Sequence, residues 1–163
     1  MDKKIKRCVF AGTFDPPTLG HKAVVEDCLK VFDEVVIALL VNPNKQTAFT
    51  VDERKEMWAL TCNTERVRIV AFEGTLAEFM KKEKIDVYVR GIRNSTDLDF
   101  ENDNFYASKK LDKDITAFYL PCRQELLHVS STMVRNSLRF STPIDEYVTK
   151  EVKNFIKHKF NKS

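Results

Sequence analysis

Apolar residues in this chain fall into five short runs that are separated by amphipathic stretches. The run from Val35 to Val41 is continuous and rich in β-branched residues, which is typical of a strand covered on both faces. Four shorter runs predict further strands, at residues 8–11, 68–72, 86–89 and 115–120. The remaining periodic stretches predict helices near residues 20–32, 51–63, 75–83, 96–110, 131–139 and 144–160.

Two of the predicted helices begin with a recognisable start signal. Thr50 lies three residues before Glu53, and Thr75 lies three residues before Glu78. In such a capping box, the threonine and glutamate side chains each accept a backbone N–H at the helix start. Strands and helices therefore alternate along the chain. This order predicts an α/β fold, a Rossmann-like doubly wound sheet of five parallel strands with helices on both faces and a C-terminal helical segment.

The composition narrows the possible partners, the number of domains and the location of the protein. The 163 residues include 27 lysines and arginines against 24 aspartates and glutamates, and the net charge of +3 is too small to indicate a nucleic-acid partner. The chain shows no linker, repeat or low-complexity tract, so we expect one domain over residues 1–163. No signal sequence is visible, and no run approaches the ~20 apolar residues that cross a bilayer. We therefore expect a soluble, cytoplasmic protein without a membrane partner.

The four cysteines carry little functional information. Cys8, Cys28, Cys62 and Cys122 are far apart and form no C-x-x-C pair. That spacing argues against a zinc site, and the absence of a signal sequence argues against a disulfide framework. We therefore expect four reduced thiols.

The segment from Gly12 to His21, GTFDPPTLGH, follows the first predicted strand and leads into the first helix. The first N–H groups of a helix have no partner within it, and the helix dipole adds partial positive charge there. Such a helix start binds anions, and His21 would lie beside the bound group. Taken alone, His21 could be a histidine packed at a helix start, but Thr13 and Gly20 beside it favour a functional role.

Cationic and hydrogen-bonding side chains follow four of the predicted strands. In an open α/β sheet, ligands bind beyond the carboxyl ends of the strands. The groups that we expect at this edge are Thr13 and His21, residues 42–45 with Lys45, residues 90–93 and residues 130–132. Their convergence from separate stretches indicates a phosphate-binding site.

Several of these groups also have a purely structural interpretation. Lys45 could be a solvated loop charge. Arg90 and Arg93 could form surface ion pairs with Asp97 or Asp99 instead of a fork for phosphate. These alternatives stay open at the level of sequence.

Two further segments can be interpreted in two ways. Ser130, Ser131 and Thr132 could cap the next helix, or they could cradle a triphosphate at its start. The C-terminal amphipathic helix could present a partner surface, although docking on the sheet or on a neighbouring subunit is the favoured interpretation.

Gly91 would let the backbone turn tightly or approach a ligand closely.

These residues resemble a known superfamily. The pieces G-T-F-D-P…G-H at 12–21 and S-S-T-x-x-R at 130–135 resemble the nucleotidyltransferases that share their core with class I aminoacyl-tRNA synthetases. Lys45, the segment 49–54, and R-G-I-R at 90–93 followed by Glu101 resemble phosphopantetheine adenylyltransferases in particular. The match covers about residues 9–135.

The resemblance implies that ATP and 4′-phosphopantetheine react to give dephospho-coenzyme A and pyrophosphate. It implies a catalytic set of Thr13, His21, Lys45 and Arg93. It places 4′-phosphopantetheine against Thr13, Lys45, Leu76 and Arg90. It places ATP against Thr13, Phe14, His21, Gly91, Ile92, Arg93, Glu101, Leu126, Leu127, His128, Val129, Ser130, Ser131 and Thr132. It also implies a homohexamer that uses Mg²⁺, which we expect to arrive with ATP because the sequence shows no carboxylate cluster for a tightly held metal.

The residue types suit an in-line attack without a covalent enzyme intermediate. The acceptor phosphate is largely a dianion at neutral pH, since its second pKa is about 6, so no general base is needed. The difficulty lies in bringing two anions together, which calls for alignment and positive charge. We expect Lys45 to bridge the nucleophile and the α-phosphate, neutral His21 to donate to an α-phosphate oxygen, and Arg93 with Ser131 to hold the departing pyrophosphate.

Three other interpretations are weaker. Another nucleotidyltransferase on this scaffold would act on nicotinamide mononucleotide or glycerol phosphate, but such relatives usually carry histidine where this chain has Thr18, and they lack the R-G-I-R spacing. An inactive regulatory module would bind ATP without turnover. A flavodoxin-like redox protein fits the sheet but explains neither His21 nor residues 130–132.

Overall fold

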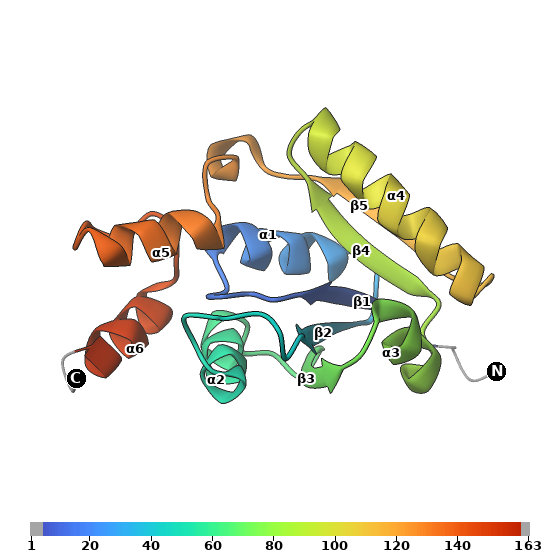
Figure 1. Ribbon diagram of the computed structural model, residues 1–163, viewed down its shortest axis with the longest axis horizontal. Helices are drawn as coiled ribbons and strands as arrows, with labels where there is room; N and C mark the ends of the chain where they lie inside the picture. Colours follow the sequence, from blue (N-terminus) through green and yellow to red (C-terminus); the bar gives the residue numbers. More distant parts are fainter. Residues whose placement is uncertain (1–4, 161–163) are drawn as a thin grey trace.

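One parallel sheet organises the chain, as the sequence predicts. The computed structural model describes residues 5–160, so residues 1–4 and 161–163 of the expected single domain lie outside the described residues. The sheet has the strand order β3-β2-β1-β4-β5 (Figure 1). Its strands are β1 (Arg7–Gly12), β2 (Glu34–Val41), β3 (Val67–Glu73), β4 (Val87–Ile92) and β5 (Thr116–Pro121).

Helices connect and follow the strands. They are α1 (Leu19–Cys28), α2 (Val51–Thr61), α3 (Leu76–Glu83), α4 (Ser95–Leu111), α5 (Ser131–Arg139) and α6 (Lys150–Phe160), with a short 3₁₀ helix η1 (Gln124–Leu126) before α5. Both predicted capping boxes are confirmed, Thr50 with Glu53 and Thr75 with Glu78. Among residues 5–160, no helix combines the length and the apolar character that a membrane span requires.

The two faces of the sheet carry different helices. Successive side chains of a strand point to opposite faces. Cys8 and Phe10 of β1 therefore join a buried cluster with Trp58 of α2 and with α1. Val9 and Ala11 point the other way, into a cluster with α3 and with α4. This confirms the prediction of helices on both faces.

The chain adds strands on both sides of β1: first β2 and β3 on one side, then β4 and β5 on the other. Strand β1 itself pairs with β2 on one side and with β4 on the other, both in parallel. In doubly wound sheets, such a change of side leaves a crevice at the carboxyl ends of the two diverging strands. The crevice between β1 and β4 is therefore the expected ligand site.

Two predicted helix boundaries are wrong. The first helix ends at Cys28 rather than at residue 32, because the chain turns there and the Asp33 N–H donates to the Lys6 carbonyl beside β1 (2.8 Å). The last helix begins at Lys150 rather than at residue 144. The Thr149 hydroxyl accepts the N–H of Val152 (3.3 Å) and so caps this helix.

The C-terminal helix docks on other helices and not on the sheet. In Figure 1, α6 lies near α5 and α2. Val152 and Ile156 of α6 are buried in a cluster with Met57 of α2 and Val134 of α5. Phe49, just before α2, belongs to the same cluster. The helix therefore does not dock on the sheet as expected. It belongs to a separate small core that it shares with α2 and α5.

Candidate active site

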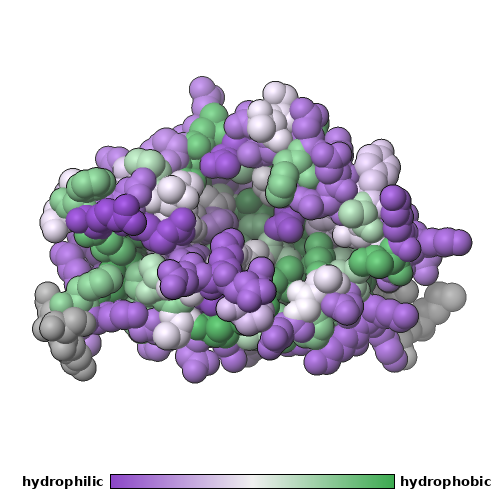
Figure 2. Space-filling view, viewed as in Figure 1, coloured by the Kyte–Doolittle hydropathy of each residue, from purple (hydrophilic) through white to green (hydrophobic). Residues whose placement is uncertain are grey.

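A cavity lies at the carboxyl ends of β1, β4 and β5. Its volume is about 290 Å³. Figure 2 shows the molecule hollowed near the centre of this face, with apolar side chains deep in the hollow and polar ones around it. The predicted site residues that line this cavity are Thr13, Phe14, His21, Arg90, Gly91, Arg93, Glu101, Leu126, Val129, Ser130 and Ser131.

A second cavity adjoins the first at Thr13. It has a volume of about 240 Å³, and its lining includes Thr13, Lys45 and Arg54. The Lys45 Nζ lies 3.3 Å from the Thr13 Oγ1. Since Thr13 lines both cavities and His21 lines the first, the structure brings His21, Thr13 and Lys45 to one edge of the sheet.

Five predicted site residues line neither of these cavities: Leu76, Ile92, Leu127, His128 and Thr132. Leu76 packs against the core on the α3 face. The Thr132 hydroxyl accepts a hydrogen bond from Arg135 (3.1 Å). Their contacts with ligands stay predictions.

His21 closes the N-terminal cap of α1. Its Nδ1 accepts the backbone N–H of Thr18 (3.0 Å), and the Thr18 hydroxyl accepts the His21 N–H (3.4 Å). An amide can only donate, so Nδ1 carries a lone pair and the proton of the neutral ring is on Nε2. The cap therefore selects the tautomer whose free nitrogen is a donor.

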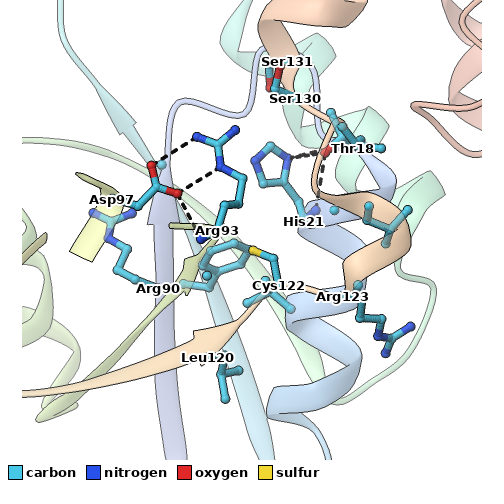
Figure 3. Close-up of a pocket in the computed structure, with 18 of the residues that line it drawn as sticks. Thr18, His21, Arg90, Arg93, Asp97, Leu120, Cys122, Arg123, Ser130 and Ser131 are labelled. Carbon is cyan, nitrogen blue, oxygen red and sulfur yellow. Dashed lines mark hydrogen bonds and ion pairs between the residues drawn. The ribbon is translucent and has the colours of Figure 1, made fainter. Parts of the chain in front are cut away.

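The surroundings keep this imidazole uncharged. Burial and, secondarily, the nearby Arg93 guanidinium lower the pKa of His21 to about 4. The ring packs edge-on against Phe14 with 4.9 Å between centroids, and Trp58 lies behind Phe14. Figure 3 shows the Arg93 guanidinium beside the His21 ring.

Arg90 and Gly91 lie within β4, not after it as predicted, because pairing with β5 continues to Ile92 and Pro121. A Cβ on Gly91 would lie 2.9 Å from Val24 Cγ2 and 3.0 Å from Cys122 Sγ. The glycine thus permits close packing between β4 and α1 and makes no tight turn.

Both arginines of the R-G-I-R segment form ion pairs. Arg93 pairs with Asp97 (3.0 Å), which is one of the two aspartates considered from the sequence. Arg90 pairs with Glu101 (3.1 Å) and also donates to the Ala11 carbonyl. Each guanidinium is therefore held in a fixed orientation beside the cavity.

The hydroxyls at the start of α5 form hydrogen bonds within the protein. The Ser130 side chain caps the helix by accepting the Met133 N–H (3.2 Å), which confirms the capping interpretation. The Ser131 hydroxyl donates to the Pro16 carbonyl (2.7 Å). Apart from the Met133 N–H, the first-turn N–H groups of α5 remain the donors that this helix offers to an anion.

Asp15 is a structural residue of the site to which the sequence assigned no role. It is 5% exposed, and its carboxylate accepts the N–H groups of Ala48 (2.8 Å) and Phe49 (2.9 Å). Its carbonyl accepts a hydrogen bond from Arg135 Nη1 (2.7 Å). The signal that could have found it is a carboxylate placed between Phe14 and two prolines in an otherwise apolar stretch.

Arg54 is the second such residue. It is 3% exposed and donates to the carbonyls of Thr13 (2.7 Å) and Phe49 (3.2 Å). A buried arginine needs such acceptors, because an unpaired buried charge is costly. Arg54 therefore fixes the backbone at the point where the two cavities meet.

Comparisons with known proteins agree with this geometry. Residues 9–137 match the family described as cytidylyltransferase-like. The phosphopantetheine adenylyltransferase of Aquifex aeolicus is 38% identical over 157 residues, which cover 96% of this chain and 97% of that protein. The phosphopantetheine adenylyltransferase of Thermotoga neapolitana is 36% identical over 145 residues, which cover 88% of this chain and 90% of that protein.

Solved structures share the fold. A putative nicotinate-nucleotide adenylyltransferase from Vibrio parahaemolyticus aligns with a TM-score of 0.74 at 23% identity, over 94% of this chain and 93% of that one. The Plasmodium falciparum nicotinic acid mononucleotide adenylyltransferase aligns with a TM-score of 0.71 at 15% identity, over 96% of each chain. The family match and the relatives above 30% identity show that this chain belongs to the cytidylyltransferase-like family and, within it, to the phosphopantetheine adenylyltransferases.

Proposed function

We propose that this protein transfers the adenylyl group of ATP to 4′-phosphopantetheine, giving dephospho-coenzyme A and pyrophosphate. The observation that carries the proposal is the junction at Thr13, where a larger cavity with His21 meets a smaller one with Lys45. ATP would occupy the first cavity, and the acceptor would occupy the second. The acceptor phosphate would then attack the α-phosphate near Thr13, and the bond between the α- and β-phosphates would break.

His21 would stabilise the α-phosphate in the transition state. Its Nε2–H is the free donor of a neutral ring, because Nδ1 is occupied by the Thr18 N–H. A donor held in place by a helix cap needs no reorientation when charge develops on the phosphate oxygen. A neutral ring also gives up no proton, which agrees with a reaction that requires no general acid or base.

Lys45 and Arg93 would supply the positive charge. Lys45 lies at Thr13, so its ammonium can bridge the two phosphates that must approach each other. Arg93 lines the larger cavity and is held by Asp97, and it would bind the departing pyrophosphate with the first N–H groups of α5. Ser131 would contribute through its backbone N–H, since its hydroxyl already bonds to Pro16.

Magnesium would enter as part of the substrate. Among residues 5–160, no three His, Cys, Asp or Glu side chains are grouped as metal ligands would be, and the four cysteines are free thiols. Mg²⁺ bound through the phosphates of ATP needs no such cage. There it would neutralise phosphate charge while the protein residues align the reactants.

The expected homohexamer and cytoplasmic location also remain proposals. Exposed apolar side chains on α4 support self-association: Phe100 is 64%, Tyr106 64% and Leu111 70% exposed. Such side chains on one helix are a common feature of subunit interfaces.

Pyrophosphate release tests the function directly. With ATP and Mg²⁺, the protein should release pyrophosphate when 4′-phosphopantetheine is added, and far less with nicotinamide mononucleotide or glycerol phosphate. Turnover with nicotinamide mononucleotide or glycerol phosphate instead would contradict the proposed acceptor. ATP binding without any turnover would support the regulatory module.

Replacing His21 should affect the chemical step above all. Loss of one preorganised donor costs about 10²–10³ in kcat, so His21→Ala should lower kcat by that factor and change the Kd for ATP far less. His158→Ala removes an exposed histidine of α6 and is the matched control. Normal turnover of His21→Ala would exclude this role for the imidazole.

The protonation state of His21 gives a prediction about pH. Its pKa of about 4 lies below the ordinary 6.5, so His21 stays neutral, with the proton on Nε2, throughout the neutral range. Because the unfolded chain binds this proton more readily, the resulting stabilisation is complete above pH 6.5 and is lost as pH falls toward 4. Titration followed by ¹⁵N NMR of the imidazole checks this, and a midpoint near 6.5 would contradict it.

Replacing Lys45 should affect both binding and rate. Lys45→Ala removes a charge that would touch the acceptor phosphate in the ground state and in the transition state. We expect the KM for 4′-phosphopantetheine to rise and kcat to fall, each by about tenfold or more. Lys110→Ala, on the exposed side of α4, should change neither value. Unchanged kinetics of Lys45→Ala would remove this residue from the site.

A further inference from the structure

One wall of the larger cavity is a strap formed by residues Cys122–Val129. Cys122, Arg123, Leu126 and Val129 of this strap line the cavity. Its two ends are anchored: the Cys122 N–H donates to the Ile92 carbonyl (2.9 Å), and Val129 is 5% exposed. The strap thus connects β5 to the start of α5 across the nucleotide side of the site.

The middle of the strap has little burial to hold it. Gln124, Glu125, Leu127 and His128 are all exposed. A segment with few buried apolar contacts opens at low free energy compared with the core. Contacts that tie the strap to the rest of the protein therefore have a large influence on the shape of the cavity wall.

Arg123 provides such a tie, to the side of α1. Its Nη1 lies 3.1 Å from Glu26 Oε2, and its Nη2 lies 3.1 Å from Asp27 Oδ1. Its Nε also donates to Asp27 Oδ2 (3.4 Å), so the guanidinium grips Asp27 with two nitrogens. Figure 3 shows Arg123 beside α1, away from Arg93 and His21.

These ion pairs connect the strap to the helix that carries His21. The guanidinium of Arg123 and the ammonium of Lys30 hold the pKa of Asp27 below its usual range, as expected of a carboxylate that is paired in the folded chain. Exposed ion pairs add little to global stability. Their effect here is local: they hold the start of this cavity wall against α1, and the His128 ring packs against Tyr147 further along it (6.1 Å between centroids).

We propose that Arg123 is a positioning residue for ATP: by binding Glu26 and Asp27, it holds the strap against α1 and so presents a preformed nucleotide cavity. This inference rests on the proposed function of the cavity as the ATP site. Arg123 does not touch the reacting phosphates. Without it, ATP must order the strap as it binds, and the cost of this ordering weakens affinity.

The test separates binding from chemistry. Arg123→Ala should raise the Kd and the KM for ATP about three- to tenfold with kcat nearly unchanged. In the free protein, hydrogen exchange at residues 124–128 should become faster, and saturating ATP should restore protection. Arg123→Lys, which keeps the charge without the two-nitrogen grip, should recover only part of the affinity. Arg139→Ala, an exposed arginine at the end of α5, is the control.

A variant with Glu26→Gln and Asp27→Asn distinguishes the strap from a direct contact. If Arg123 holds the strap, this variant should also bind ATP more weakly, although it removes negative charge near the cavity. If Arg123 binds ATP itself, freeing it should leave affinity unchanged or improve it, and that result would overturn the proposal, as would unchanged ATP affinity of Arg123→Ala. The Kd for ATP is measured without the acceptor, so failure of turnover with 4′-phosphopantetheine would count against the proposed function and not against the strap.

Discussion

The loop after β1 is held in place by two charged side chains that are almost completely buried. Burying a charge is favourable only where hydrogen bonds replace water. Asp15 meets this condition through two backbone N–H groups that precede α2, and Arg54 meets it through the carbonyls of Thr13 and Phe49. The two residues thus lock the loop to the α2 start. The meeting of the two cavities at Thr13 depends on this lock.

His21 is likewise held by local hydrogen bonds. One hydrogen bond from Thr18 completes the cap of α1 and also selects the tautomer of the imidazole. The cap of α1, the tautomer of the imidazole and the direction of the Nε2–H therefore depend on the same hydrogen bond. This coupling explains how a short loop with a single histidine can present a donor whose orientation is fixed before any ligand binds.

The sequence predicted what depends on local patterns. Strand periodicity, the caps at Thr50 and Thr75, and the gathering of site residues at one sheet edge all follow from spacing alone. It did not identify partners that only long-range packing brings together. The hydrogen bond from Arg54 to the Thr13 carbonyl, and the docking of α6 on α2 and α5, depend on segments that lie far apart in the chain. Such contacts have no signature within a window of neighbouring residues.

Residues in the last quarter of the chain hold the loop that follows β1. Arg135 holds the Asp15 carbonyl, Ser131 holds that of Pro16, and the Tyr147 carbonyl accepts the N–H of Leu19. During translation, the loop after β1 can therefore adopt its final form only after the last quarter of the chain has left the ribosome. A partially synthesised chain can pair β1 with β2, but it lacks the contacts that hold the loop after β1.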